Sequence, residues 1–270
     1  MSRVDRDAVA PIDPATLTRL IEGTFVQSAE HHTILTSTND RGMELARTNS
    51  DQACLIYAET QTAGRGRGDH QWHSAPGSLT CSLLVPCPSA SATVGSLHVA
   101  VAIAKACNAF LKDREISVKW PNDLYFARRK LGGILIESPA ASSQWIVGIG
   151  LNVNNEARHI DPAATSPISL AEVAETPLNR ANLLHELLLQ LGLLCHGGSF
   201  ATLPTLAPDD WSHYCMLSGK QITVDTPHGE ISGMCRGIDA NGRLLLQEDN
   251  ANGIAGPLHK LASANGISLT

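Results

Sequence analysis

A short glycine-rich segment, residues 61–72 (QTAGRGRGDHQW), carries residue types suited to binding an anion. Glycines and arginines alternate in its centre: Gly64, Arg65, Gly66, Arg67 and Gly68. The glycines free the backbone for close approach and left-handed angles, so successive N–H groups can surround an anion. The two guanidinium groups add permanent charges in a fork that suits phosphate or carboxylate. We therefore expect an anion-binding loop. The alternatives are a flexible surface turn and an RGG-type RNA tail, although such tails form long tracts.

A second polar segment, VKWPNDLY, follows a predicted strand that ends at Lys119. Pro121 cannot continue strand pairing, and Asn122 with Asp123 forms a turn rich in hydrogen-bonding groups. Taken alone, an ordinary Asx turn is the simpler interpretation of this segment.

Two further strands end in or begin with polar residues. Lys130 enters a wholly apolar strand, where partial desolvation would make it a charge partner for a buried anion; the alternative places it at the solvent end of that strand. The segment 146–153 (IVGIGLNV) predicts a buried strand that terminates at Asn152. Its Gly148 and Gly150 would permit close approach of a neighbouring backbone, unless this is a plain core strand.

Upstream, residues 36–40 (TSTND) offer hydroxyl and amide groups directly before a predicted helix. A helix N-cap explains such residues without any ligand, and we expect the segment both to cap and to bind. The helix is predicted over residues 41–47, with Asn39 or Asp40 as its cap.

These segments need a scaffold, and the hydrophobic pattern predicts an α+β one. Short runs rich in Val, Ile or Leu predict strands over residues 53–58, 79–85, 116–119, 133–137 and 145–153. Helical spacing predicts further helices over residues 14–23, 94–111 and 180–195. After Trp211, strands over residues 219–224, 229–238 and 243–248, with a hairpin turn at Asn241-Gly242, predict a small β-barrel. The expected divisions are a lead-in (1–30), a main domain (31–211) and the barrel (212–270).

Composition narrows the class of protein. The 270 residues are 43% hydrophobic and carry a net charge of −6, which argues against a dedicated nucleic-acid binder. Seven scattered cysteines without a C-x-x-C pair fit reduced thiols, and the histidines (His31, His32, His70, His73 and His196) lack a ligand framework, so no metal site is predicted. With no apolar signal core and no apolar run near about 20 residues, we expect a cytoplasmic protein without membrane contact.

The order of the polar segments resembles that of biotin protein ligases. The resemblance rests on Ser37-Thr38-Asn39, Gln61 with the GRGR loop, KWPND at 119–123, RKLGGIL at 129–135 and GIGLNVN at 148–154. The stretch 233–246 (GMCRGIDANGRLLL) is similar to that family's small C-terminal β-barrel. The resemblance covers about residues 30–270 and implies a mixed β-sheet flanked by helices, with the barrel appended. KWPND followed closely by RKLGGIL is its most specific part.

The resemblance also implies roles for individual residues. The biotin-binding residues would be Ser37, Thr38, Asn39, Gln61, Arg65, Gly66, Arg67 and Lys130. Among these, Lys130, Arg65 and Arg67 would be catalytic, with Lys130 contacting the activated carboxylate. The nucleotide-binding residues would be Lys119, Trp120, Asn122, Asp123 and Asn152.

The implied reaction joins biotin to ATP and then to a lysine of a biotin carboxyl carrier protein. Its first step brings two anions together, so fixed cations must offset their repulsion and Mg²⁺ must neutralise the departing pyrophosphate. No DNA partner is expected, and the chain would be a monomer or a homodimer. The sequence departs from the family where its loop reads GRGRGDHQW instead of GRGRxGRxW, with His70 at the third basic position.

Rival interpretations remain open at this point. The residues before the first polar segment leave no room for the helix-turn-helix of many bacterial members, so no repressor function is expected. Lipoate or octanoate ligation would show an RRxSGGG-type loop, which this sequence lacks. A DNA-binding regulator would show binding that collapses with salt, and an inactive scaffold would need none of the charged residues.

Overall fold

A seven-stranded mixed sheet forms the larger part of the molecule. The computed structural model describes residues 10–47, 52–87, 91–139, 143–157, 167–195, 199–200, 203, 206, 208–249 and 255–270. Across the sheet the strands follow the order β1 (Ser28–Leu35), β2 (Cys54–Gln61), β5 (Leu79–Pro86), β9 (Gln144–Leu151), β8 (Arg129–Glu137), β7 (Asp123–Phe126) and β6 (Ser117–Lys119). Only β1 and β2 pair in parallel among these neighbours, and the other pairs are antiparallel.

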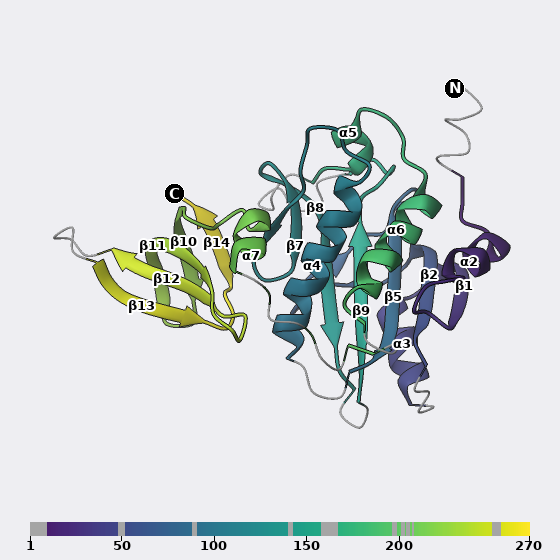
Figure 1. Ribbon diagram of the computed structural model, residues 1–270, viewed down its shortest axis with the longest axis horizontal. Coiled ribbons are helices and arrows are strands. Elements are labelled where there is room, and N and C mark those ends of the chain that lie inside the picture. The colour runs from purple at the N-terminus through teal and green to yellow at the C-terminus, as the bar shows by residue number, and fades with distance from the viewer. Residues whose placement is uncertain are drawn as a thin grey trace.

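Helices cover both faces of this sheet. Figure 1 shows α4 (Ala92–Asn108) and α6 (Arg180–Gly192) lying across one face. On the other face, α3 (Thr38–Ala46) contacts β2, β5 and β9. Alternate residues of the central strands serve the two layers because successive side chains of a strand point to opposite faces. Ile56, Leu84 and Ile146 belong to the cluster beside α3, and Leu55, Leu83 and Val147 to the larger core.

Three shorter helices complete this part of the chain. The first, α2 (Pro14–Ile21), is capped by Asp13, contacts β1 and α6, and begins with a proline, which the first turn tolerates. The helix α5 (Leu170–Ala174) starts at a reciprocal capping box between Ser169 and Glu172. The third, α7 (Pro208–Tyr214), leads into the second sheet.

The second sheet has five antiparallel strands, which confirms the predicted small C-terminal β-domain. Its order is β13 (Ala255–Leu261), β12 (Leu244–Asp249), β11 (Gly229–Ile238), β10 (Gln221–Thr226) and β14 (Gly266–Leu269). Gly242 adopts a positive φ of 75° in the turn between β11 and β12, where the sequence predicts a hairpin. The indole N–H of Trp120 donates to the carbonyl of Gly242 at 2.9 Å, and Met216 N–H donates to Val118 O at 2.9 Å. Hydrogen bonds through turns therefore link the two parts of the molecule.

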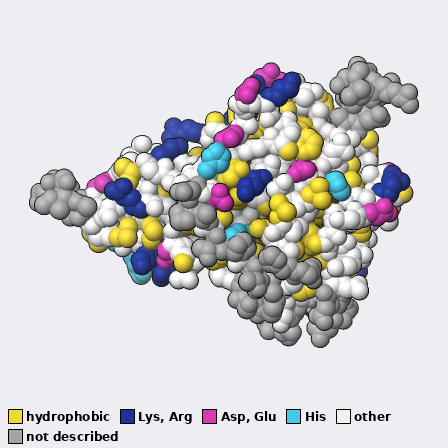
Figure 2. All heavy atoms as spheres, viewed as in Figure 1, with side chains coloured by type: hydrophobic (Ala, Val, Ile, Leu, Met, Phe, Trp, Pro, Cys, Tyr) yellow, Lys and Arg dark blue, Asp and Glu magenta, His cyan; other side chains and the backbone are white. Residues whose placement is uncertain are grey.

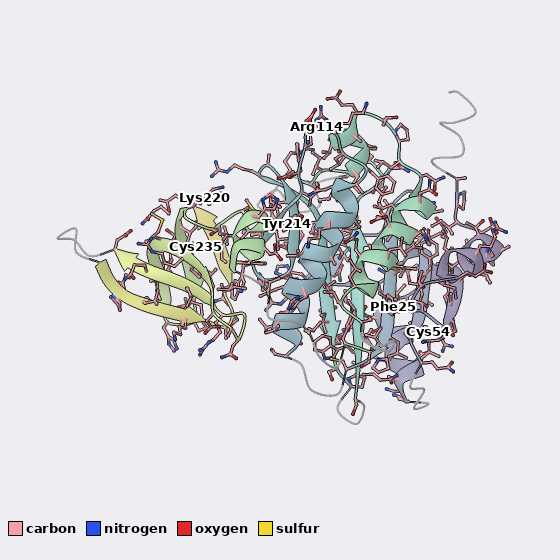
Figure 3. All side chains as sticks on the ribbon, viewed as in Figure 1. Phe25, Cys54, Arg114, Tyr214, Lys220 and Cys235 are labelled. Atoms are coloured by element: carbon pink, nitrogen blue, oxygen red, sulfur yellow. The ribbon has the colours of Figure 1, made fainter. Side chains whose placement is uncertain are left out.

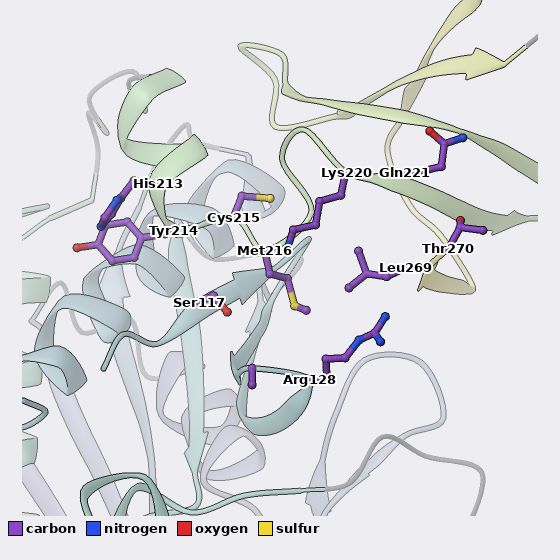
Figure 4. A pocket seen from close by; sticks show the side chains of 11 residues that line it. Ser117, Arg128, His213, Tyr214, Cys215, Met216, Lys220, Gln221, Leu269 and Thr270 are labelled. Atoms are coloured by element: carbon purple, nitrogen blue, oxygen red, sulfur yellow. The ribbon is translucent and has the colours of Figure 1, made fainter. Parts of the chain in front are cut away.

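A cavity of about 720 Å³ lies at this junction (Figure 4). Ser117 of β6, Tyr214 at the end of α7 and Leu269 of β14 are among the residues that line it. None of its lining residues belongs to the predicted site. On the face drawn in Figure 2, cationic and anionic side chains of the described residues are interspersed.

The fold class is confirmed, and several element boundaries differ from expectation. The cap of α3 is Ser37, whose hydroxyl accepts from Asp40 N–H, so the prediction of Asn39 or Asp40 as cap was wrong. The strand predicted from residue 133 begins at Arg129, and β1 lies partly in the expected lead-in. The domain boundaries at 30 and 211 stay predictions. Among the described residues, no helix combines the length and the apolar character that crossing a bilayer requires.

Candidate functional site

The glycine-rich segment forms a small hairpin. Strands β3 (Gly64–Arg65) and β4 (Gln71–Trp72) pair antiparallel, and Gly66 N–H donates to His70 O at 2.7 Å. A Cβ at Gly64 would collide with the carbonyl of Trp72 and the amide of Gln61. Of the three loop glycines, only Gly68 has a positive φ, of 57°. The segment is therefore an ordered turn, and Gly64 is required for space instead of for a left-handed angle.

Arg65 points from this hairpin to carboxylates of two other elements. Its Nη1 and Nη2 donate to Glu137 Oε1 and Oε2 at 2.8 and 2.6 Å, and Nη2 lies 2.8 Å from Asp40 Oδ1. The hydrogen bonds to Glu137 raise the pKa of Arg65 above its ordinary value. Arg67 is exposed, and its Nη1 reaches Asn122 Oδ1 at 3.4 Å. The hairpin thus contacts the end of β8, the first turn of α3 and the turn before β7.

A buried polar network lies beside the hairpin. Thr38 donates to Gln61 Oε1 from its backbone N–H at 2.6 Å and from its hydroxyl at 3.0 Å. The hydroxyl of Ser82, in β5, lies 2.7 Å from Thr38 Oγ1 and 2.6 Å from Asn39 Oδ1. Ser37, Thr38, Asn39 and Gln61 are each 9% exposed or less. The structure therefore joins Thr38, Asn39 and Gln61 in one network, and Ser37, the cap of α3, precedes them in the chain.

Two glycines of β9 leave room for the side chains of this network. A Cβ at Gly148 would collide with the amide of Asn39, and one at Gly150 would collide with the indole of Trp72. The sequence predicts close approach of a backbone at both positions, whereas side chains approach instead. Trp72 packs on the sheet at Gly150, and this contact holds the C-terminal strand of the hairpin in place.

Three charged residues of the predicted site share one face of β6, β7 and β8. Lys130 Nζ donates to Asp123 Oδ1 at 2.8 Å. Lys119 Nζ lies 5.6 Å from the ring centroid of Tyr125, which pairs with Lys130 across β7 and β8. Burial lowers the pKa of Lys119, Asp123 opposes that shift, and Lys130 adds to it. This edge of the sheet therefore holds two ammonium groups and one carboxylate close together.

The remaining predicted nucleotide contacts differ in exposure. Trp120 is 2% exposed and directs its indole N–H to Gly242 of the second sheet. Asn122 uses its Nδ2 to donate to Ile134 O at 2.7 Å, which leaves its Oδ1 toward Arg67. Asn152 is 8% exposed, and its Oδ1 accepts from Asn155 Nδ2 at 2.9 Å. Contacts of these residues with a nucleotide stay predictions.

Sequence reasoning missed Glu137 and Ser82. Glu137 follows the apolar run of β8 directly, and Ser82 is a single hydroxyl in an apolar strand, so neither stands out by pattern. Both become recognisable only through their contacts with Arg65 and Asn39. Within the described residues, no three His, Cys, Asp or Glu side chains gather as a metal site would require.

The arrangement suits a substrate that is polar at one end and anionic at the other. The buried network of hydroxyl and amide groups adjoins the Arg65–Glu137 pair. A connected set then leads from Arg67 through Asn122 and Asp123 to Lys130. Guanidinium and ammonium groups fixed around one edge can lower the repulsion between two anions.

Comparisons with known proteins show what the chain is similar to. Residues 31–154 match the biotin/lipoate A/B protein ligase family, and residues 217–268 match the biotin protein ligase C terminal domain. The bifunctional ligase/repressor BirA of Bacillus subtilis is 31% identical over 229 residues, which cover 80% of this chain and 68% of the relative. The biotin–[acetyl-CoA-carboxylase] ligase of Mycobacterium tuberculosis is 32% identical over 220 residues, covering 78% and 79%.

Solved structures show the same fold. The biotin protein ligase from Aquifex aeolicus, in complex with biotin and ATP, superposes with a TM-score of 0.72 and 24% identity, over 90% of this chain and all of that one. A biotin protein ligase from Leishmania major in complex with biotinyl-5-AMP gives a TM-score of 0.59 over 87% of this chain.

Proposed function

The chain belongs to the biotin/lipoate A/B protein ligase family, among its biotin protein ligases, and on this premise we infer that it adenylates biotin and passes it to a carrier lysine. Identity above 30% with relatives of that activity, over two thirds or more of their length, supports the assignment. The observation that carries the mechanism is the adjacency of a buried network of amide and hydroxyl groups to a cationic edge.

Adenylation is required because a carboxylate is a poor electrophile. Joining biotin to AMP creates a mixed anhydride with a stable phosphate ester as leaving group. The step brings the biotin carboxylate into contact with the α-phosphate of ATP, and two anionic groups in contact repel each other. Fixed positive groups that need no reorganisation lower this barrier most effectively. Arg65, Arg67 and Lys130 are the groups that we propose for this role.

The buried polar network suits the ureido ring of biotin. That ring presents two N–H donors and one carbonyl acceptor, and buried polar groups must find partners. We propose that Ser37, Thr38, Asn39 and Gln61 supply them, with Gly66 in the hairpin above the ligand. The aliphatic tail would then run toward Lys130.

We propose that the nucleotide lies along the neighbouring edge, by Lys119, Asn122, Asp123 and Asn152. Since the indole of Trp120 is buried against the second sheet, its proposed part at the nucleotide is to support the turn that carries Asn122. ATP would enter as its Mg²⁺ complex, because Mg²⁺ is usually held by substrate phosphates and one or two carboxylates.

The second step is attack of a lysine amine on the anhydride. It forms an amide and releases AMP, and it needs no serine or cysteine nucleophile from the enzyme. We propose a biotin carboxyl carrier protein as the acceptor, with cytoplasm as the site of action. All seven cysteines are free thiols and six are buried, as a reducing compartment favours. A monomer or a homodimer remains the prediction.

The decisive experiment mixes the purified chain with labelled biotin, ATP, Mg²⁺ and a biotin-accepting carrier domain. We expect covalent label on the carrier alone, dependent on ATP. A carrier whose acceptor lysine is replaced by arginine serves as the matched control and should stay unlabelled. Absence of label from the intact carrier, with the chain folded and ATP present, would overturn the proposed function.

A further inference from the structure

Glu137 joins two parts of the site that the sequence leaves separate. It is the last residue of β8, and its side chain is 19% exposed. Its carboxylate accepts two hydrogen bonds from Arg65, and its Oε2 also accepts from Asn39 Nδ2 at 2.7 Å. One carboxylate therefore contacts both the cationic hairpin and the buried amide of the polar network.

These contacts decide which way the amide of Asn39 points. An ionised carboxylate only accepts hydrogen bonds, so it forces the NH₂ group of Asn39 toward itself. A second hydrogen bond from Nδ2 to Leu135 O, at 3.3 Å, has the same requirement. The carbonyl oxygen must then point to the opposite side, where it accepts from the Ser82 hydroxyl. That oxygen has a second lone pair, which remains for an N–H donor.

The orientation matters for the ligand. A ureido N–H needs an acceptor, and a flipped Asn39 amide would present a donor in its place, leaving buried donors opposed. The same carboxylate holds Arg65 in a bidentate pair. Glu137 therefore both orients the Asn39 amide and fixes the hairpin beside the polar network.

We propose that Glu137 is a positioning residue of the biotin site. It keeps the Asn39 carbonyl directed toward the ureido N–H, and it aligns the Arg65 hairpin with the polar network. The inference rests on the proposed function, since it assumes that Asn39 contacts biotin. It predicts that Glu137 controls the affinity for biotin and leaves the affinity for ATP and carrier nearly unchanged.

The first test is Glu137→Gln, which keeps the size of the side chain and removes its charge. The new amide offers Asn39 and Arg65 only one acceptor oxygen, and its NH₂ group faces donors. We expect the KM for biotin to rise at least about tenfold, the loss typical of one charge-assisted hydrogen bond. The KM values for ATP and for the carrier should change less than about threefold.

A double variant tests the orientation itself. Asn39→Asp alone places two carboxylates against each other and should weaken biotin binding strongly. In Asn39→Asp/Glu137→Gln, the glutamine NH₂ can donate to the aspartate, whose other oxygen still accepts from the ligand side. We therefore expect the KM for biotin to fall when Glu137→Gln is added to Asn39→Asp. Glu137→Gln should thus raise the KM for biotin in the wild-type chain and lower it in the Asn39→Asp chain.

The matched control is Glu175→Gln. Glu175 also accepts from an arginine, Arg114, which Figure 3 shows beside α5. None of the predicted site residues hydrogen-bonds to this pair among the described contacts. The control should keep the wild-type KM for biotin, and both single Gln variants should unfold at nearly the wild-type temperature.

The outcomes separate the two hypotheses. If the wild-type chain does not label the carrier, the proposed function fails. If it does, and Glu137→Gln leaves the KM for biotin unchanged, or raises it equally with and without Asn39→Asp, the role of Glu137 is refuted. A fall in unfolding temperature for Glu137→Gln well beyond that of the control also refutes it, because Glu137 would then be structural.

Discussion

Replacing Lys130 by alanine separates catalysis from stability at the cationic edge. Its ammonium lies 2.8 Å from Asp123 Oδ1, and the two side chains are 37% and 26% exposed. Pairs this accessible to water contribute about 0–1 kcal/mol to folding. The free energy of unfolding should therefore fall by about 1 kcal/mol or less, which corresponds to about 4 °C or less in Tm for a chain of this size.

The expected effect on adenylation is much larger. Lys130 is proposed to face the biotin carboxylate where it meets the α-phosphate, and one lost preorganised contact of this kind costs about 100-fold or more in rate. A 100-fold loss equals about 2.7 kcal/mol in activation free energy. The substitution should therefore nearly abolish turnover in a chain that remains folded.

The assay measures biotin-dependent pyrophosphate release by wild type and Lys130→Ala, with thermal unfolding of both. Lys105→Ala is the control, since Lys105 is an exposed lysine of α4, 6.0 Å from the ring centroid of Tyr214 and outside the predicted site. Near-normal pyrophosphate release from Lys130→Ala would refute the catalytic role. A fall in Tm far beyond 4 °C would show that the lysine is mainly structural.

Three further predictions concern other parts of the chain. Gly148→Ala should raise the KM for biotin at least about tenfold because its methyl group collides with the Asn39 amide. Titration curves for labelled biotin that are the same for the variant and the wild type would contradict this. Arg180→Met should lower the free energy of unfolding by about 3–5 kcal/mol, because it leaves the largely buried Glu59 without the arginine that lies 2.8 Å away; denaturant unfolding measures it, and a loss below about 1 kcal/mol would argue otherwise. Burial lowers the pKa of Lys119 below 10.5, so the folded chain loses this proton at a lower pH than the unfolded chain does. At neutral pH the charged lysine therefore lowers the free energy of unfolding. The stability difference between wild type and Lys119→Met should therefore narrow as the pH rises through the lowered pKa toward 10.5, and a constant difference would contradict it.

The apolar strands could be predicted because their hydrophobic composition reflects their burial. All eight residues of β9 and seven of the eight of β5 are buried, and their runs of Val, Ile and Leu indicate strands directly. The strand β1 (SAEHHTIL) escaped prediction because it lies at the sheet edge and none of its residues is fully buried. Its parallel pairing with β2 requires a crossover connection, and α3 lies in that connection. Local periodicity does not record such a pairing.

Residue type predicted the cationic groups of the site, but their partners could not be read from the sequence. Arg65 lies 72 positions from Glu137, and only the antiparallel run of β8 beside β9 brings that carboxylate to the hairpin. A glutamate at the end of an apolar strand otherwise indicates a solvated terminus. Trp120 shows the converse limit, since a motif position expected at a nucleotide directs its indole into the junction with the second sheet.

The cations of the proposed site begin paired with the protein's own carboxylates, and this has a consequence for the reaction. Arg65 is shared by Glu137 and Asp40, and Lys130 is held by Asp123, so each stands oriented before a substrate arrives. A substrate anion that displaces these partners gains less than it would from a free cation, because the existing pair must be broken. An anion that joins the pair instead meets an arginine with unused N–H donors, since the guanidinium has five. Arg67, exposed and 3.4 Å from one neutral amide, has no such competitor among its described contacts. In the proposed reaction Arg67 is therefore the cation most available to the substrate anions, while Arg65 and Lys130 are held in position by their carboxylate partners.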